Sequence, residues 1–363
     1  MEKRYPVVEV DLKKLRHNID EILSRCAAQG ISVTGVVKGF NGIVPAARQF
    51  EESGCIGLGS SRLEHLEEAR KAGCKKPMLA LRVPMLSEIP DLVRICDISL
   101  NSEVEVLKAI DAECAKQKKK HDVILMADLG DLREGFWDKD EMTEAAVMVE
   151  KELENVHLLG IGVNLGCYGS INPTVEKMND LIAIAEKIEA AIGRKLEIIS
   201  GGATTSLPLV LNKIMPERIN HLRCGEGILL GYDLQNLWGV DMSFLNFDVF
   251  TVKAEIVELK EKPSHPVGEI FVDWMGNKVK YEDKGIRKKA LVGLGKLDVV
   301  YTDALVPRAQ GIEILGGSSD HLILDLNDDP VDRKVGDILE FDVRYSTMMY
   351  TTASQYLRVE IIG

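Results

Sequence analysis

Short apolar runs alternate with amphipathic stretches along the first two thirds of the chain. The runs are rich in β-branched residues and fit strands that are buried on both faces. They stand at Val33–Val37, Cys55–Leu58, Met78–Leu81, Ile98–Leu100, Val123–Ala127, Leu158–Val163, Leu196–Ile199 and His221–Arg223. Between them, apolar residues recur at helical spacing in Arg62–Ala72, Glu103–Lys118, Glu141–Leu153, Val175–Ile192 and Leu207–Ile214.

Eight strands that alternate with helices over this stretch predict a (β/α)₈ barrel. A doubly wound sheet is the alternative, but it would usually need fewer strands and a glycine-rich first turn, which the sequence lacks. A short strand from Val7 precedes the pattern, and Asp11 is a plausible N-cap for a helix through Leu15, Ile19 and Ile22.

The pattern changes after Gly231, where strand-like runs follow one another with few helical stretches between them. They are Thr251–Lys260, Ile270–Trp274, Lys289–Leu294, Ile312–Leu315, His321–Leu326, Ile338–Tyr345 and Leu357–Ile362. Turn signals such as Asn327-Asp328-Asp329-Pro330 separate them. We therefore expect a barrel over residues 1–237 and a β-rich second domain over residues 238–363.

Composition narrows the class of protein. With 363 residues, 45% hydrophobic and 28% charged, the chain is expected to be a soluble globular protein of more than one domain. The net charge of -12 argues against a nucleic-acid or anionic-membrane partner. Its seven cysteines are scattered and form no C-x-x-C pair, which indicates reduced thiols in the cytoplasm rather than a metal site or a disulfide framework.

One lysine closes the first barrel strand, in Val36-Val37-Lys38-Gly39-Phe40-Asn41-Gly42. If that strand end opens into a pocket, burial lowers the pKa of the lysine. It then becomes an amine nucleophile of the kind that forms Schiff bases with carbonyls and with pyridoxal phosphate (PLP). The alternative is that Lys38 extends into solvent at an ordinary strand end.

The residues that follow the other strands are expected at the same rim of the barrel. The last two of these loops, Ser200–Ser206 and Arg223–Gly227, combine glycines with hydroxyls and fit a phosphate cradle. The alternative is that their glycines only permit tight turns and that Thr204 caps a helix.

Several motifs together resemble the PLP-dependent alanine racemases. They are Lys38 in its Val-Val-Lys-Gly-Phe-Asn-Gly context, the opening Val8-Glu9-Val10-Asp11-Leu12, and Arg223-x-Gly225 before Leu229-Leu230-Gly231. The ornithine racemase branch is the closer likeness, through stretches that lie at Asp128–Gly135, Gly160–Asn164, Glu258–Pro263, Glu282–Arg287 and Ser318–His321. This resemblance runs nearly end to end, and it implies a barrel of PLP fold type III followed by a β-rich domain.

The resemblance also implies roles for individual residues. Lys38 would bind PLP as a Schiff base and later serve as a base, and Arg223 would face the pyridine nitrogen, although Glu226 lies only three residues on. Arg133 would lie near the cofactor oxygen and the substrate carboxylate; pairing with Asp131 or Glu134 is the alternative. The remaining expected cofactor contacts are Asn164, Ser200, Thr204, Thr205, Gly225, Glu226 and Tyr345.

Racemisation needs proton exchange on both faces of the α-carbon, so a second group must oppose Lys38. In alanine racemases this is a tyrosine from the partner subunit, but its surroundings are missing here and Lys262–Pro266 occupies the comparable place. The family's tyrosine soon after the PLP lysine is also absent. His265, Tyr281 and His321 are therefore candidates for the second base, and a base from a partner would require a homodimer.

The expected activity is racemisation of a basic amino acid such as ornithine or lysine. A distal ammonium needs an acidic or carbonyl partner, and Asp128, Asp131, Glu134 and Asp320 are all candidates. The alternatives are an alanine or broad-specificity racemase, a PLP-dependent decarboxylase, and a non-catalytic PLP carrier. A decarboxylase would be expected to place a carboxylate against the pyridine nitrogen and a cysteine, here Cys167 or Cys224, near the α-carbon.

Overall fold

The computed structural model describes residues 4–272 and 276–363. The chain divides into two compact units, of which one spans Leu12–Phe247 and the other combines the first strand with residues from Asp248 onward. The second unit therefore begins ten residues later than the boundary that we expected after residue 237. In the described part of the chain, no helix has both the length and the apolar character needed to cross a membrane.

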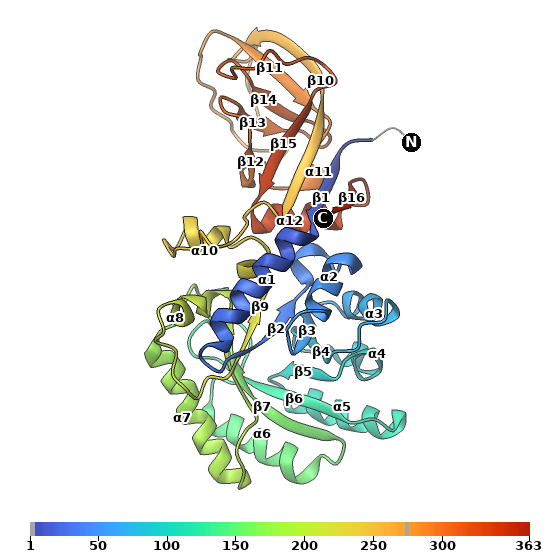
Figure 1. Ribbon diagram of the computed structural model, residues 1–363, viewed down its shortest axis with the longest axis vertical. Coiled ribbons are helices and arrows are strands. Elements are labelled where there is room, and N and C mark those ends of the chain that lie inside the picture. Colours follow the sequence, from blue (N-terminus) through green and yellow to red (C-terminus); the bar gives the residue numbers. More distant parts are fainter. Residues whose placement is uncertain (1–3, 273–275) are drawn as a thin grey trace. The chain divides into compact units, whose positions relative to one another are not determined.

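The first unit is a closed barrel of parallel strands, each paired with the next in chain order (Figure 1). Its strands are β2 Ser32–Val36, β3 Gly57–Ser60, β4 Met78–Ala80, β5 Ile98–Asn101, β6 His121–Ala127, β7 Val156–Val163, β8 Ile198–Ala203 and β9 His221–Cys224. Every strand predicted from the apolar runs corresponds to one of them, and β9 pairs with β2 to close the ring. The expected (β/α)₈ barrel is confirmed.

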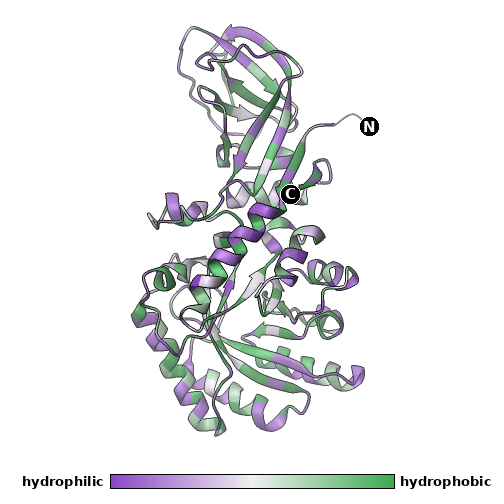
Figure 2. Cartoon of the chain, in the orientation of Figure 1, coloured by the Kyte–Doolittle hydropathy of each residue, from purple (hydrophilic) through white to green (hydrophobic). Residues whose placement is uncertain are grey.

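Helices lie before, between and after the barrel strands along the chain. They are α1 Leu12–Ala27, α2 Val44–Glu51, α3 Leu63–Lys71, α4 Ile89–Ile95, α5 Val104–Gln117, α6 Lys139–Glu152, α7 Val175–Ile192, α8 Leu207–Leu211, α9 Glu226–Leu229 and α10 Tyr232–Asn236. Short 3₁₀ turns are η1 Lys38–Phe40, η2 Leu86–Glu88 and η3 Thr204–Ser206. In Figure 2, β6 and β7 are mostly hydrophobic, whereas α7 mixes both colours, as expected for a helix that buries one face.

The barrel interior is filled by side chains from neighbouring strands. Leu79, Leu100, Ile124, Met126 and Leu159 form one apolar cluster there, with almost no exposed surface. Ile124 and Met126 lie two residues apart on β6, which places both on the same face of the strand. This packing gives the strand ends a fixed frame, so the residues that follow each strand are held at one rim.

The second unit is built around an antiparallel sheet. Its strands are β1 Val7–Asp11, β10 Phe250–Pro263, β11 Ile286–Val292, β12 Leu305–Pro307, β13 Glu313–Gly317, β14 Leu322–Asp325, β15 Ile338–Val343 and β16 Arg358–Ile362, with the short helical segments α11 Lys296–Val299, η4 Thr302–Ala304 and α12 Tyr345–Ala353. Along the sheet the order is β12-β15-β10-β11-β14-β13, while β1 pairs with β10 and with β16. The opening strand, which we expected in the barrel domain, therefore belongs to this sheet (Figure 1).

Two predictions for this unit are wrong. Residues 270–272 of the strand expected over Ile270–Trp274 are not in a strand, and the rest of that segment lies outside the described residues. The strand expected over Ile338–Tyr345 ends at Val343, and Tyr345 begins α12 instead. Threonines make α12 look strand-like, but their hydroxyls donate to carbonyls one turn back, as Thr351 does to Thr347 at 2.9 Å.

Candidate active site

Lys38 lies two residues after the end of β2, as the first residue of η1. Val36 and Val37 before it are buried, and Asn41 after it adopts the left-handed conformation (φ 52°) that ends the 3₁₀ turn. Burial, followed by the nearby Arg133 cation, lowers the pKa of the Lys38 ammonium. Within residues 4–272 and 276–363 this ammonium has no hydrogen-bond partner, so the sequence-based expectation of a partly dehydrated amine at a strand end agrees with its surroundings.

Arg223 lies on β9, which pairs with β2, the strand that precedes Lys38. Its side chain is buried; Nη2 donates to the carbonyl oxygen of Val163 at 2.8 Å, and Nη1 donates to Oγ of Ser200. Burial lowers the pKa of Arg223 to about 10, which still leaves the guanidinium charged at neutral pH. No hydrogen bond joins it to Glu226 in the part of the chain that the structure describes, so this neighbour does not neutralise it.

A chain of hydrogen bonds behind Arg223 was not expected from the sequence. Ser200 Oγ lies 2.8 Å from Nδ1 of His221, and Nε2 of His221 lies 2.9 Å from Oγ1 of Thr34. Burial, and after it the charge of Arg223, lowers the pKa of His221 to about 3, so the imidazole is neutral. Ser200 thus accepts from the guanidinium and positions it. The sequence does contain one sign of these hydrogen bonds: His221 and Arg223 are two residues apart on a predicted strand, so their side chains share a face.

Acid is expected to destabilise the barrel through His221 and a second buried histidine, His121, whose pKa burial lowers to about 4. An unfolded histidine titrates near about 6.5, so below that pH the unfolded chain binds more protons than the folded one. The free energy of unfolding should therefore fall as pH decreases from about 6.5 toward 4, by roughly 1.4 kcal/mol per unit for each residue. Urea denaturation at several pH values measures this slope.

The matched variants for this measurement are His221→Asn and His157→Gln. The side chain of His157 is 43% exposed, so its replacement should leave the acid slope nearly unchanged, whereas His221→Asn should flatten it. Equal slopes in both variants and the unchanged protein would contradict this assignment.

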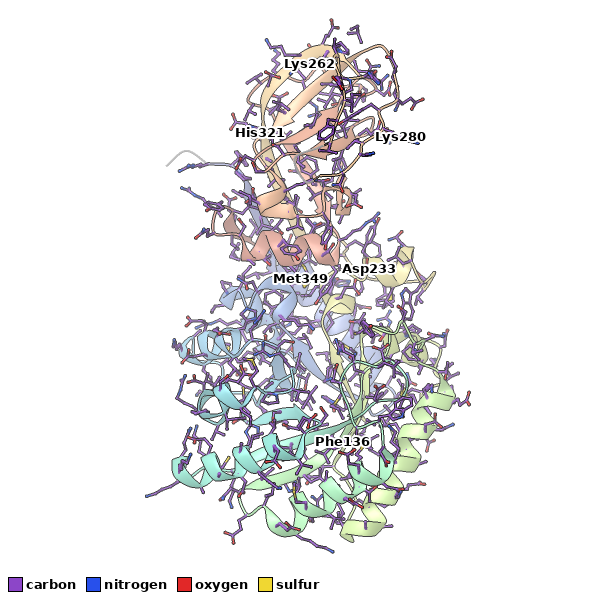
Figure 3. The ribbon with its side chains drawn as sticks, turned by 180° about the vertical axis from the view of Figure 1, so that it is seen from behind. Phe136, Asp233, Lys262, Lys280, His321 and Met349 are labelled. Carbon is purple, nitrogen blue, oxygen red and sulfur yellow. The ribbon has the colours of Figure 1, made fainter. Side chains whose placement is uncertain are left out.

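The loop after β6 returns to the strand from which it starts. Phe136, labelled in Figure 3, donates its N–H to the carbonyl of Met126 at 2.8 Å, and its own carbonyl accepts from Asp128 at 3.1 Å. A side chain at Gly135 (φ 131°) would place its Cβ 2.5 Å from the Asp128 nitrogen, so only glycine fits this return. The loop therefore has little freedom, and Arg133, which it carries, is held at the rim.

Arg133 pairs with its neighbour Glu134. Nη2 of Arg133 donates to Oε1 of Glu134 at 2.5 Å, and Nε donates to the second carboxylate oxygen. The Glu134 side chain is 17% exposed and that of Arg133 is 43% exposed. The structure thus contains the pairing of Arg133 with Glu134, which was one of the alternatives for this arginine. Arg133 also lies close enough to Lys38 to lower the pKa of the lysine.

The Asp131 carboxylate binds the backbone of a neighbouring loop. It is buried and accepts backbone N–H groups from the loop after β7, including those of Gly166 and Tyr168 at 3.0 Å each. Burial alone would raise the pKa of Asp131, but these bonds outweigh it and lower the pKa. The carboxylate thus ties two active-site loops together. Asp128 is likewise occupied within its loop, by the N–H groups of Gly130 and Leu132.

The loops after β8 and β9 meet, as the phosphate hypothesis requires. Thr204 Oγ1 accepts the N–H of Gly227 at 2.9 Å, and Thr205 Oγ1 donates to the carbonyl of Leu165 at 2.8 Å. Gly225 immediately precedes α9, and Glu226 begins it. Burial, followed by the nearby Asp233, raises the pKa of the Glu226 carboxyl to about 7.

The loop after β7 contributes two further polar groups. Asn164 is 9% exposed, and its buried Nδ2 has no hydrogen-bond partner among residues 4–272 and 276–363, so this group could donate to a bound molecule. Cys167 is an exposed free thiol, whereas the other cysteines are buried. Its charge in the thiolate form would raise the pKa of Lys38, so it lies near that lysine.

The candidates for the second base all lie in the β-rich unit. His265 Nδ1 is 2.8 Å from the carbonyl oxygen of Pro266, and its ring meets that of Tyr281 edge-on at 6.3 Å. His321, labelled in Figure 3, is exposed at the start of the β14 region. Tyr345 is half-buried at the start of α12. The structure thus brings His265 and Tyr281 together, and the roles of all four residues stay predictions.

Known proteins resemble this chain both in a family profile and over the full length of the sequence. The family profile described as alanine racemase, N-terminal domain, matches residues 10–233. An ornithine racemase from Acetoanaerobium sticklandii is 40% identical over 358 residues, which cover 99% of this chain and 100% of that protein. A lysine racemase from Thermotoga maritima is 38% identical over 353 residues, or 97% of each chain.

Solved structures agree at the level of the fold. The alanine racemase of Clostridium difficile 630 superposes with a TM-score of 0.78 at 18% identity and covers 100% of this chain and 97% of its own. An alanine racemase from Streptomyces lavendulae gives 0.77 at 19% identity, with 100% and 98% covered. With a barrel profile that covers over half of the chain and full-length relatives at 40% and 38% identity, the expected resemblance is confirmed: the chain belongs to the alanine racemase family.

Proposed function

We propose that the chain is a PLP-dependent racemase that interconverts the L- and D-forms of a basic amino acid, ornithine or lysine. The observation that carries the proposal is a pair of basic side chains from adjacent parts of the barrel: Lys38, just after β2, and Arg223, on the neighbouring strand β9. Lys38 has a lowered pKa and no hydrogen-bond partner in the described chain, and Arg223 is buried and fixed beside it. The relatives that span nearly the whole chain are named ornithine racemase and lysine racemase, which supports the basic substrate.

The residues at the rim fit PLP. In the described chain, the Lys38 amine and Nδ2 of Asn164 have no hydrogen-bond partner, and they match an aldehyde and a ring substituent. The loop after β8 matches a phosphate through the Thr204 hydroxyl, which accepts the Gly227 N–H and keeps its own proton to donate. Thr205 would have to exchange its bond to the Leu165 carbonyl for one to the phosphate. Lys38, Arg223, Gly225, Glu226 and Tyr345 complete the proposed set, with Ser200 acting through Arg223. When bound, PLP supplies an electron sink for the pair of electrons left at the α-carbon.

Side chains of the protein control the removal and return of the α-proton. Arg223 keeps its charge at neutral pH, so it would donate to the pyridine nitrogen of bound PLP and would keep that nitrogen unprotonated. Lys38, with its lowered pKa, accepts and returns a proton on one face. A second group must act on the other face, and His265, Tyr281 and His321 are its candidates. In this proposal the enzyme is a homodimer, because the family supplies that group from the partner subunit.

We also place the protein in the cytoplasm, where free thiols persist. All seven cysteines are unpaired, and six of them are buried.

A decarboxylase is the second candidate, because Cys167 is an exposed thiol near Lys38. Arg223 weighs against it, since a decarboxylase would be expected to place a carboxylate at the pyridine nitrogen. A PLP carrier is disfavoured by the presence of the β-rich unit. An alanine or broad-specificity racemase would share the same proton chemistry and differ only in the substrate.

Chiral chromatography of L-ornithine, L-lysine and L-alanine after incubation with the enzyme and PLP tests the proposal. We expect D-ornithine or D-lysine to form faster than D-alanine, without release of CO₂. Turnover of alanine alone would overturn the choice of substrate, CO₂ release would favour the decarboxylase, and bound PLP without any turnover would indicate a carrier.

A further inference from the structure

An ion pair lies at the barrel rim close to the lysine nucleophile. Arg133 contacts both carboxylate oxygens of Glu134, in the loop that follows β6 and returns at Phe136 to bond with that strand. The two charges also act on Lys38, whose pKa Arg133 lowers and Glu134 raises. A substrate that reaches Lys38 therefore enters beside one fixed cation and one fixed anion.

Glu134 differs from the other carboxylates that could contact a substrate. Asp131 is saturated by backbone N–H groups, and Asp128 closes its own loop. Glu226 accepts the N–H of Asp233, and Asp320 is exposed and accepts the hydroxyl of Ser319. Of these five carboxylates, Glu134 is the one whose hydrogen bonds come from a cationic side chain, the guanidinium of Arg133, for which a substrate ammonium could substitute.

We propose that Glu134 is the specificity-determining residue for basic substrates: it receives the distal ammonium, while Arg133 receives the α-carboxylate. This inference rests on the proposed function and names the residue that selects its substrate class. A diamino acid carries both complementary charges, so its binding exchanges the internal ion pair for two intermolecular ones. A neutral amino acid takes Arg133 but leaves Glu134, with its 17% exposed side chain, uncompensated.

The test compares L-ornithine with L-norvaline, which has the same carbon chain and no distal ammonium. Glu134→Gln keeps the shape and removes the charge. It should lower kcat/KM for L-ornithine by about 10- to 100-fold, mainly through KM, and change kcat/KM for L-norvaline by no more than about threefold. Glu134→Asp should recover part of the activity toward L-ornithine. Glu144→Gln, at an exposed position of α6, is the matched control and should behave as the unchanged enzyme.

Each outcome has a distinct meaning. Equal losses for both substrates in Glu134→Gln would show that Glu134 only positions Arg133, and would overturn the inference while the proposed function stands. An unchanged enzyme that racemises neither L-ornithine nor L-lysine would overturn both. Visible absorbance of bound PLP in each variant verifies that the cofactor is in place.

A second measurement needs no variant. On the unchanged enzyme, 5-aminopentanoate and pentanoate differ only in the distal ammonium, and we expect 5-aminopentanoate to inhibit about tenfold more strongly or better. Added salt should narrow that difference. Equal inhibition by the two compounds would overturn the inference even if Glu134→Gln failed to fold.

Discussion

Lys38→Ala is expected to abolish racemisation, with a loss of about 1,000-fold or more, and to remove the visible absorbance of bound PLP. The lowered pKa of Lys38 reflects its burial and the nearby Arg133 cation, so the unprotonated amine is more available here than on a surface lysine. Alanine removes the amine that would bind the cofactor and the base that would move the α-proton. Absorbance spectra and chiral chromatography of the same samples measure both effects.

The control for this variant is Lys13→Ala, because Lys13 is exposed on α1. It should retain both absorbance and activity. Borohydride reduction of the unchanged enzyme, followed by peptide mapping, gives an independent answer, since the reduced adduct should be found on Lys38. An adduct on another lysine, or none, would contradict the assignment.

The barrel could be predicted because each of its strands is buried on both faces and is therefore an apolar run. Val123–Ala127 and Leu158–Val163 lie within β6 and β7, and the helices between strands keep their amphipathic spacing. The strand predicted over Ile338–Tyr345 extends two residues beyond β15, to the start of α12. The threonines of α12 favour strands by shape, but a helix forms where their hydroxyls find backbone carbonyls to bond. α12 also packs against α11 and β15, and the local pattern does not contain such contacts.

The position of Lys38 could also be predicted, and so could that of Arg223. Parallel strands of a barrel end at one rim, so residues after different strands meet without any knowledge of side-chain contacts. The hydrogen-bond partners of the carboxylates in these loops could not be predicted in this way. Asp131 and Glu134 are three residues apart, yet one is saturated by the N–H groups of a distant loop and the other pairs with Arg133. Those partners depend on how two loops fold over each other.

Arg223→Glu is expected to keep PLP bound through Lys38, to lower racemisation by about 100-fold or more, and to increase transamination. The guanidinium at this position donates to Ser200 and to the carbonyl of Val163, and it stays charged because burial lowers its pKa only to about 10. A carboxylate would instead favour a protonated pyridine nitrogen, which strengthens the electron sink and opens the side reaction. Formation of the 2-oxo acid during the racemisation assay measures this change.

Folding must be separated from chemistry in this test, because Arg223→Glu loses the donor to Val163 and places a new anion in a buried position. Arg223→Lys keeps the positive charge, and a lysine can still donate to the carbonyl or to Ser200. It should retain part of the racemase activity without additional 2-oxo acid. Ser200→Ala leaves the arginine but removes one acceptor, and should lower kcat with little change in transamination. If Arg223→Lys and Arg223→Glu produced the same amount of 2-oxo acid per turnover, the charge at this position would not control the fate of the proton, and the role assigned to Arg223 would be wrong.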